Sequence, residues 1–168
     1  MVACAKALCV PHDSGMLRKA LHAVAFSDED KITTKVDYLK KILRWSHNEV
    51  GIALPKAPML LTYSKDRLQR VSEFLISEAG LEPGYSAHRP AMLNYSLDSR
   101  LRPRYYVVMF LKENGFLHRD RDYYGTVMIT EKVFMDKFIC PHKEAAPHLA
   151  EDYAAACRGE VPARFRFT

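Results

Sequence analysis

The sequence lacks a long hydrophobic run. No stretch of about 18 uncharged apolar residues occurs, which is the length that a membrane-spanning helix needs, and the longest candidate, 105–111, is much shorter. The beginning of the sequence also lacks arginine, and Lys6 is the one Lys or Arg among residues 1–15. Organelle presequences, by contrast, are amphipathic and rich in arginine. We therefore expect no membrane partner, and either a trimmed fragment or a chain without such a presequence.

Cysteine is scarce and widely spaced. The four cysteines show neither CxxC spacing nor the density of a disulfide-bonded domain, which favours a reducing compartment; they are Cys4, Cys9, Cys140 and Cys157. A zinc site could draw on Cys140, His142, His148 and Cys157, but their spacings match no familiar ligand pattern. We expect buried or unreactive thiols, no metal and no cofactor.

A catalytic arrangement is missing as well. The segments 12–14 (HDS) and 118–120 (HRD) bring polar groups together. Neither places a nucleophile, a base and an orienting acid in a recognisable frame. We expect that the protein is not an enzyme.

The positive charge is concentrated in the middle of the chain. The net charge of the whole sequence is +5, and residues 31–121 alone carry 16 Lys and Arg against 9 Asp and Glu. Residues 1–30 and 122–168 are each slightly acidic. A basic stretch attracts polyanions, because neutralising phosphates releases counterions, although an excess of lysine can equally serve to solvate a surface. Charge alone leaves both readings open.

A phrase in this basic stretch occurs twice. Residues 58–68 read PMLLTYSKDRL and residues 90–101 read PAMLNYSLDSRL. Pro, Leu, Tyr, Ser and Asp recur at an offset of 32, and one inserted residue makes the Arg-Leu offset 33. A period of this size is typical of stacked repeats, which bury their apolar faces against their neighbours.

Helical signals fill each repeat, and no segment has the period of a strand. Apolar residues at 32, 36, 39 and 43 follow a helical stripe, and Ser46 with Glu49 forms a capping box for a second, shorter helix. Ser64 and Ser96 begin the next units, and Pro103 is expected to kink its helix or delay its start. We therefore predict one helical-repeat domain over 1–168, with repeats at about 27–63, 64–95 and 96–130, C-terminal helices over 131–158, and a loose tail from Val161.

These residues resemble a known family. The pattern Pro-x-x-Leu-x-Tyr-Ser-x-x-x-Arg-Leu-x-Pro-Arg over 90–104, the segment 115–117 (GFL), and 130–134 (TEKVF) with 138–141 (FICP) are similar to the mitochondrial transcription termination factor (mTERF) family, in particular its plant-type members. The likeness covers about 27–157. It implies an all-α fold in which each repeat has two helices and a short 3₁₀ turn, and in which the repeats stack as a curved left-handed α-solenoid.

The resemblance also implies a function. Members of the family bind double-stranded DNA or RNA in mitochondria or chloroplasts, where they affect transcription termination, transcription level or RNA processing. This chain departs from the family pattern because it holds about three repeats and because the slot at 123–130 lacks the proline. We therefore expect a C-terminal portion of a longer protein.

The candidate phosphate contacts are arginines that lie off the apolar stripes. They are Arg67, Arg70, Arg100, Arg102, Arg104, Arg119 and Arg121. Arg104 could equally bond the carbonyls of a neighbouring helix. Replacing Arg67 and Arg70 by alanine is predicted to weaken binding to all sequences without lowering thermal stability.

Another set of residues is interpreted as structural. Each proline of the repeated phrase should end a helix, and each leucine should pack into the core between repeats; these residues are Pro58, Leu61, Pro90 and Leu93, with Pro103 beside them. The alternative function is a helical-repeat scaffold that binds a protein partner on an apolar concave surface. Binding that falls steeply with salt would favour the nucleic acid.

Overall fold

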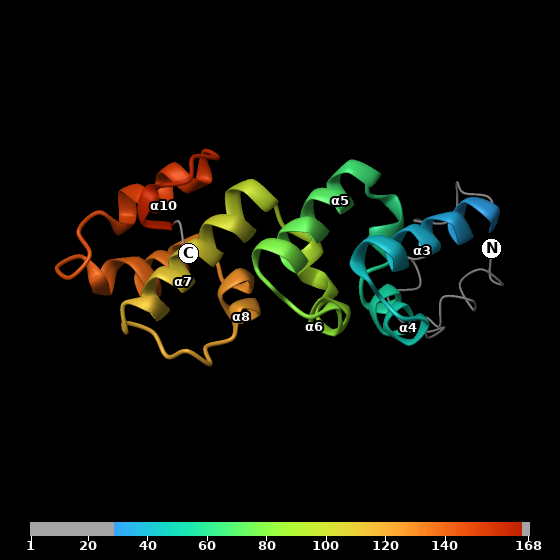
Figure 1. The fold of residues 1–168 in the computed structure, drawn as a ribbon, viewed down its shortest axis with the longest axis horizontal. Coiled ribbons are helices and arrows are strands. Elements are labelled where there is room, and N and C mark those ends of the chain that lie inside the picture. Colours follow the sequence, from blue (N-terminus) through green and yellow to red (C-terminus); the bar gives the residue numbers. More distant parts are fainter. Residues whose placement is uncertain (1–28, 166–168) are drawn as a thin grey trace. The chain divides into compact units, whose positions relative to one another are not determined.

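The computed structural model describes residues 29–165, and within this range every regular element is helical. The all-α prediction is thus confirmed (Figure 1). The α-helices are α3 (Glu29–Leu43), α4 (His47–Lys56), α5 (Lys65–Glu73), α6 (Pro83–His88), α7 (Arg102–Glu113), α8 (Tyr123–Met128), α9 (Glu131–Phe134) and α10 (Leu149–Cys157). None of these helices is long and apolar enough to cross a membrane. The first repeat was expected to begin at about residue 27, which lies outside the described residues.

Short helical turns of other types join or extend these helices. Turns with 3₁₀ geometry are η1 (Pro58–Thr62), η3 (Pro90–Asn94), η6 (Cys140–His142) and η7 (Ala163–Phe165). Turns with π geometry are η2 (Phe74–Glu78), η4 (Leu97–Leu101) and η5 (Met135–Ile139). Two successive repeats therefore read helix, helix, 3₁₀ turn, as the resemblance implies. The described residues divide into two compact units, unit 1 ending at Asn94 and unit 2 beginning at Tyr95.

Capping hydroxyls begin the second repeat, the third repeat and the C-terminal helices. The side chains of Ser64, Ser96 and Thr130 accept hydrogen bonds from the amide three residues later, at 3.2, 3.2 and 3.4 Å. Ser46 starts α4 with the full capping box, in which Glu49 also accepts from the Ser46 amide. These caps satisfy amides that the first helical turn leaves without a partner.

The two proline turns bury their motif residues unequally. Pro58 and Pro90 are buried just after α4 and α6 end, as expected. Leu93 is 1% exposed, but Leu61 is only half-buried, and in the first phrase Leu60 is the fully buried leucine. The core contact expected of Leu61 is therefore made by its neighbour. At 123–130 the second helix α8 occupies the slot, and Ile129 follows it without a 3₁₀ turn.

The first helix of each repeat ends at a residue with a positive φ angle. These residues are Arg44, Gly80 and Gly115, with φ of 55°, 62° and 71°. Trp45 and Phe116 then donate their amides to Lys40 and Leu111, five residues back, at 3.0 and 2.8 Å, which is the bond of a Schellman cap. Glycine adopts this conformation freely, whereas an L-residue with a side chain pays about 1 kcal/mol or more. Arg44 thus occupies a glycine position.

Aromatic side chains are buried within each unit. In unit 1, Trp45 is buried after α3 and donates to the Pro83 carbonyl and the Ser86 hydroxyl of α6, at 3.1 and 3.0 Å. In unit 2, stacked Phe134 and Phe138 pack with Tyr153 and Phe165. The tail from Val161 was expected to be loose, but Phe165 is 2% exposed. Burying one large aromatic side chain is enough to hold this short segment.

Candidate nucleic-acid interface

Arg67 and Arg100 have equivalent positions in successive repeats, and both bind backbone. The Arg67 guanidinium lies over the Tyr63 ring, 4.2 Å from its centroid, and donates to the carbonyls of Leu93 and Asn94 at 3.3 and 2.8 Å. Arg100 lies over the Tyr95 ring at 4.5 Å. It donates to the Ile129 carbonyl at 2.9 Å. Each of these arginines therefore binds the segment that ends its own repeat.

The inserted residue in the second phrase is absorbed by a π turn. Arg67 lies three residues after its cap, Ser64, and Arg100 lies four residues after Ser96. The π turn η4 covers this stretch, with the Leu101 amide donating to the Ser96 carbonyl five residues back at 2.9 Å. Because a π turn holds one more residue than an α turn, Arg100 still reaches the ring of Tyr95.

Pro103 and Cys157 fit the same turn. An α-helix would pair the Ser99 carbonyl with the amide of residue 103, which proline lacks. The Cys157 thiol donates to this carbonyl instead, at 3.7 Å. Burial raises the pKa of Cys157, so the thiol stays protonated near neutral pH and is a poor nucleophile or metal ligand. Among the described residues, no group of three His, Cys, Asp or Glu side chains could hold a metal ion.

Replacing Arg67 by methionine is expected to lower the free energy of unfolding by about 1–2 kcal/mol, because two carbonyls lose a charged donor and the ring contact is lost. The structure thus gives a reason to expect a stability cost where the sequence suggested none. Arg70→Met, one turn later on an exposed position of α5, should change stability by no more than about 0.5 kcal/mol. Urea denaturation compares the two. Equal losses would show that the carbonyl contacts of Arg67 contribute nothing.

Arg104 is buried, which answers the question that its sequence position leaves open. Its exposed fraction is 0%, and its guanidinium lies 4.6 Å from the Phe134 ring centroid. It donates to the carbonyls of Thr126, Val127 and Ile129 at 2.8, 3.2 and 2.8 Å, and to Glu131 Oε2 at 2.7 Å. The second of the two alternatives, bonding to helix carbonyls, therefore describes Arg104, and a buried guanidinium cannot reach a phosphate.

The remaining candidates in unit 2 lie beside acids. Arg102 pairs with Asp98 at 3.1 Å. Arg119 and Arg121 are exposed in the loop 118–122. This loop also contains two aspartates, so its net charge is zero when His118 is counted as neutral. His118 contacts one of these, Asp120. Local acids weaken the attraction of these arginines for a polyanion.

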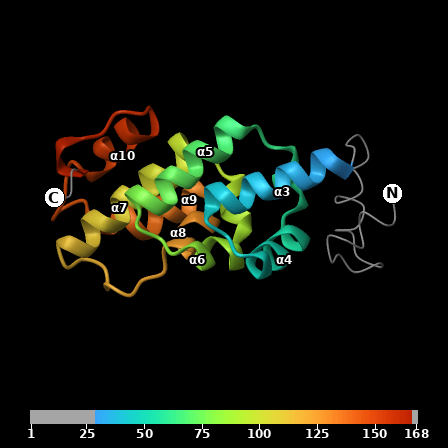
Figure 2. The same ribbon diagram turned by 45° about the vertical axis from the view of Figure 1, so that its right-hand side comes forward.

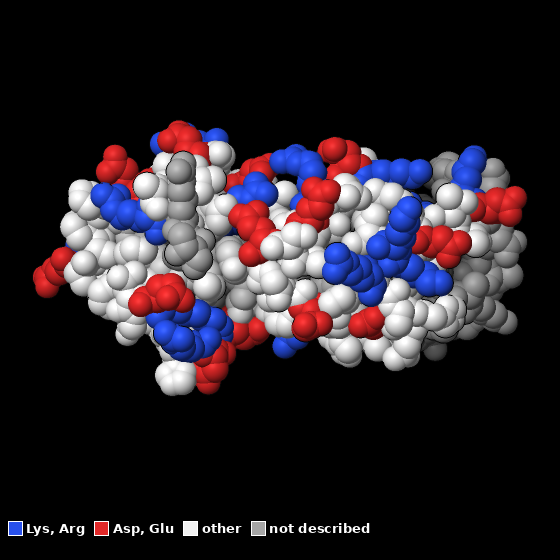
Figure 3. Space-filling view, viewed as in Figure 1, with Lys and Arg blue, Asp and Glu red and all other residues white. Residues whose placement is uncertain are grey.

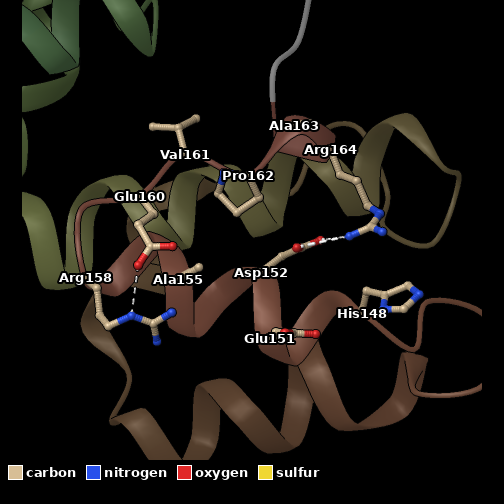
Figure 4. Close-up of a pocket in the computed structure, with 10 residues that line it drawn as sticks. All are labelled: His148, Glu151, Asp152, Ala155, Arg158, Glu160, Val161, Pro162, Ala163 and Arg164. Atoms are coloured by element: carbon tan, nitrogen blue, oxygen red, sulfur yellow. Dashed lines mark hydrogen bonds and ion pairs between the residues drawn. The ribbon is translucent and has the colours of Figure 1, made fainter.

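A polar cleft beside α10 holds two further arginines (Figure 4). Its volume is about 400 Å³. Arg158 pairs with Glu160 at 3.1 Å and Arg164 with Asp152 at 3.0 Å, and Figure 4 shows both pairs inside the cleft. Because each arginine already has a carboxylate partner, the cleft is poorly suited to phosphate.

The candidates chosen from the sequence leave out the cations of α3, of the residue after it and of the start of α5. Between residues 31 and 70 there are nine Lys and Arg and three Asp and Glu, whereas 71–121 carry seven and six. The exposed members of the first set, Lys41, Arg44 and Lys65 among them, lie on α3, just after it and on α5. A count in shorter windows would have found this concentration from the sequence alone.

The chain is similar to one protein family and to two of its members from a plant. The sequence model of the mTERF family matches residues 9–119. Transcription termination factor MTERF15, mitochondrial, from Arabidopsis thaliana is 28% identical over 89 residues, which are 53% of this chain and 20% of that protein. Transcription termination factor MTEF18, mitochondrial, from the same plant is 25% identical over 108 residues, or 64% and 19%.

The matched segments span about a fifth of the length of these relatives. No solved structure matches the chain. The family match covers most of the chain, and it includes both copies of the repeated phrase. The helix, helix and 3₁₀ turn of each of the first two repeats agree with what the resemblance implied. The chain belongs to the mTERF family.

Proposed function

We propose that the protein binds double-stranded DNA or RNA and regulates organelle gene expression, through transcription termination, transcription level or RNA processing. Membership of the mTERF family supports this, as do the names of the two relatives, which describe mitochondrial transcription termination factors. The proposal places the protein in the mitochondrion or the chloroplast, as a regulator and not as an enzyme. The stacked, curved solenoid remains part of the proposal.

The observation that carries the proposal is the excess of cations over acids between residues 31 and 70. In water, a net positive surface gains affinity for a polyphosphate chiefly by releasing condensed counterions. The exposed cations of this stretch lie on α3, just after it and on α5, and include Lys41, Arg44 and Lys65. They can therefore meet a backbone without any movement of the fold.

The seven arginines chosen from the sequence contribute unequally to the proposed interface. Arg70 is exposed on α5 and remains the best of them. The candidates also include Arg102, Arg119 and Arg121, although neighbouring acids weaken their attraction for a polyanion. Arg67 and Arg100 are half-buried and hold carbonyls, so they can offer only their outer edges, and Arg104 is left out because it is buried.

The affinity for a short duplex is expected to fall by on the order of 100-fold between about 50 and 200 mM salt, which corresponds to about four phosphate contacts. Fluorescence anisotropy of labelled duplex DNA, duplex RNA and single strands at several salt concentrations measures this. The comparison also tells which nucleic acid is preferred. If no duplex binds at low salt, or if the affinity does not change with salt concentration, the proposed function is wrong.

The scaffold alternative gains no support from the surface. A protein-binding site of the expected kind needs a contiguous apolar patch. The large apolar side chains that are exposed among the described residues lie in four separate segments; they are Met59, Phe116, Met128 and Val161. Each is only 38–42% exposed. Scattered residues of this kind are ordinary on a soluble surface.

A further inference from the structure

The helices α3 and α5 lie side by side in unit 1 and run in the same direction (Figure 2). Their contact is centred on Tyr38, whose hydroxyl donates to the Lys65 carbonyl at 3.1 Å and to Gln69 Oε1 at 3.5 Å. Lys35 and Lys65 contact the Tyr38 ring with their ammonium groups, at 5.9 and 5.4 Å from the centroid. Figure 3 shows Lys and Arg side chains gathered over the part of unit 1 that holds α3.

Two positive charges, those of Lys35 on α3 and Lys65 on α5, lie close together on this pair of helices. Partial burial lowers the pKa of Lys35, and the neighbouring charge of Lys65 lowers it further. The Lys35 ammonium also donates to the Tyr63 carbonyl. Like charges held together repel one another, and an anion placed between them relieves the repulsion.

Farther along the two helices, a hollow of about 250 Å³ lies between them. We call it the first-repeat groove; its polar lining is Lys41, Arg44, Gln69, Ser72, Glu73 and Ser77. Its one acid, Glu73, accepts a hydrogen bond from Gln69 at 2.6 Å. Both Lys41 and Arg44 are exposed, and neither side chain forms a hydrogen bond or ion pair with another described residue.

Arg44 carries its charge at a conformational cost. It ends α3 with a φ of 55°, where the equivalent positions of the next two repeats hold Gly80 and Gly115. Glycine would remove the strain, and the cap bond from Trp45 uses only backbone atoms. The backbone cap would therefore form equally well with glycine, and the arginine adds its positive charge at the C-terminal end of α3. Its charge is what distinguishes it.

We infer that the first-repeat groove, with Lys41 and Arg44, and the Lys35–Lys65 pair at the far end of the same helices bind the sugar-phosphate backbone of a nucleic-acid duplex. This inference rests on the proposed function and gives it a location outside the arginines chosen from the sequence. Residues 35 and 44 are separated by about 13 Å along α3 at the helical rise of 1.5 Å per residue. The two cationic ends can therefore hold separate phosphates of one strand.

The experiment compares two double variants with equal loss of charge. Lys41→Gln with Arg44→Gly removes the two cations of the first-repeat groove. Lys137→Gln with Lys143→Gln removes two exposed lysines from the acidic C-terminal part of the chain. Anisotropy with a labelled DNA duplex and an RNA duplex of the same sequence, at several salt concentrations, gives the affinity and its salt slope. Thermal denaturation of each variant reports folding.

The groove variant is expected to lose at least about tenfold in affinity near 0.1 M salt, and its salt slope should fall by about 2. Its thermal midpoint should change little, since the relief of strain at residue 44 offsets the loss of two cations from the C-terminal end of α3. The control should bind within about twofold of the unmodified chain. Equal losses in both variants, or none in either, would overturn the inference while leaving the proposed function intact. Failure of the unmodified chain to bind any duplex would instead overturn both.

Discussion

Replacing Arg104 by methionine is expected to lower the free energy of unfolding by about 3 kcal/mol. The last turn of α8 leaves its carbonyls without helical partners, and the Arg104 guanidinium supplies donors to Thr126 and Val127. Leaving a buried carbonyl unpaired costs about 1–3 kcal/mol. Methionine fills much of the space and avoids desolvating a charge, which recovers part of the loss.

Two details limit the size of this effect. The Ile129 carbonyl keeps a donor in the variant, because Arg100 also binds it at 2.9 Å. Glu131 is 59% exposed, so water can replace its lost partner, and it keeps the hydrogen bond from the Tyr153 hydroxyl at 3.1 Å. The cost therefore comes mainly from two carbonyls of α8.

Urea denaturation followed by far-UV circular dichroism measures the loss, with Arg102→Met as the matched control. Arg102 lies two residues away and pairs with a partly exposed aspartate, and such a pair contributes about 0.5 kcal/mol or less. Arg104→Lys adds a folded intermediate case, since one ammonium can satisfy only part of the carbonyl set. If Arg104→Met costs no more than Arg102→Met, the buried guanidinium does not hold α8.

Replacing Leu93 by alanine is expected to cost about 3 kcal/mol, the second large effect. Leu93 is 1% exposed in the turn η3, and removing a buried leucine side chain costs its transfer free energy and leaves a cavity. The same change at Leu61, its half-buried counterpart in η1, should cost about 1 kcal/mol. Denaturation of both variants compares the two phrases. Equal costs would mean that the turns bury their leucines to the same energetic extent, contrary to the structure.

Local signals in the sequence predicted the repeat plan. Hydroxyl caps at Ser64 and Ser96 and proline at the turns each act within a few residues, so a single sequence reveals them. The family resemblance then supplied the order of helix, helix and 3₁₀ turn. The burial of Leu60 in place of Leu61 could not be predicted from the sequence, because both leucines fit the same phrase.

The site was harder to predict because arginine partners lie far along the chain. Arg104 binds carbonyls that begin 22 residues later, and Arg67 binds carbonyls 26 and 27 residues later. The residues near each arginine in the sequence do not show whether its guanidinium binds distant backbone carbonyls or faces a phosphate. The insertion before Arg100 was visible, but its absorption in a π turn depends on three-dimensional packing.

Footprinting of lysine side chains by acetylation tests the central claim most directly, since it locates bound duplex on the unmodified chain. Mass spectrometry follows the acetylation rate of each lysine with and without a saturating duplex. The account predicts that duplex slows the reaction several-fold at Lys41 and Lys65, and leaves Lys137 and Lys143 unchanged. Protection of the C-terminal pair with free reaction at Lys41 and Lys65 would contradict it.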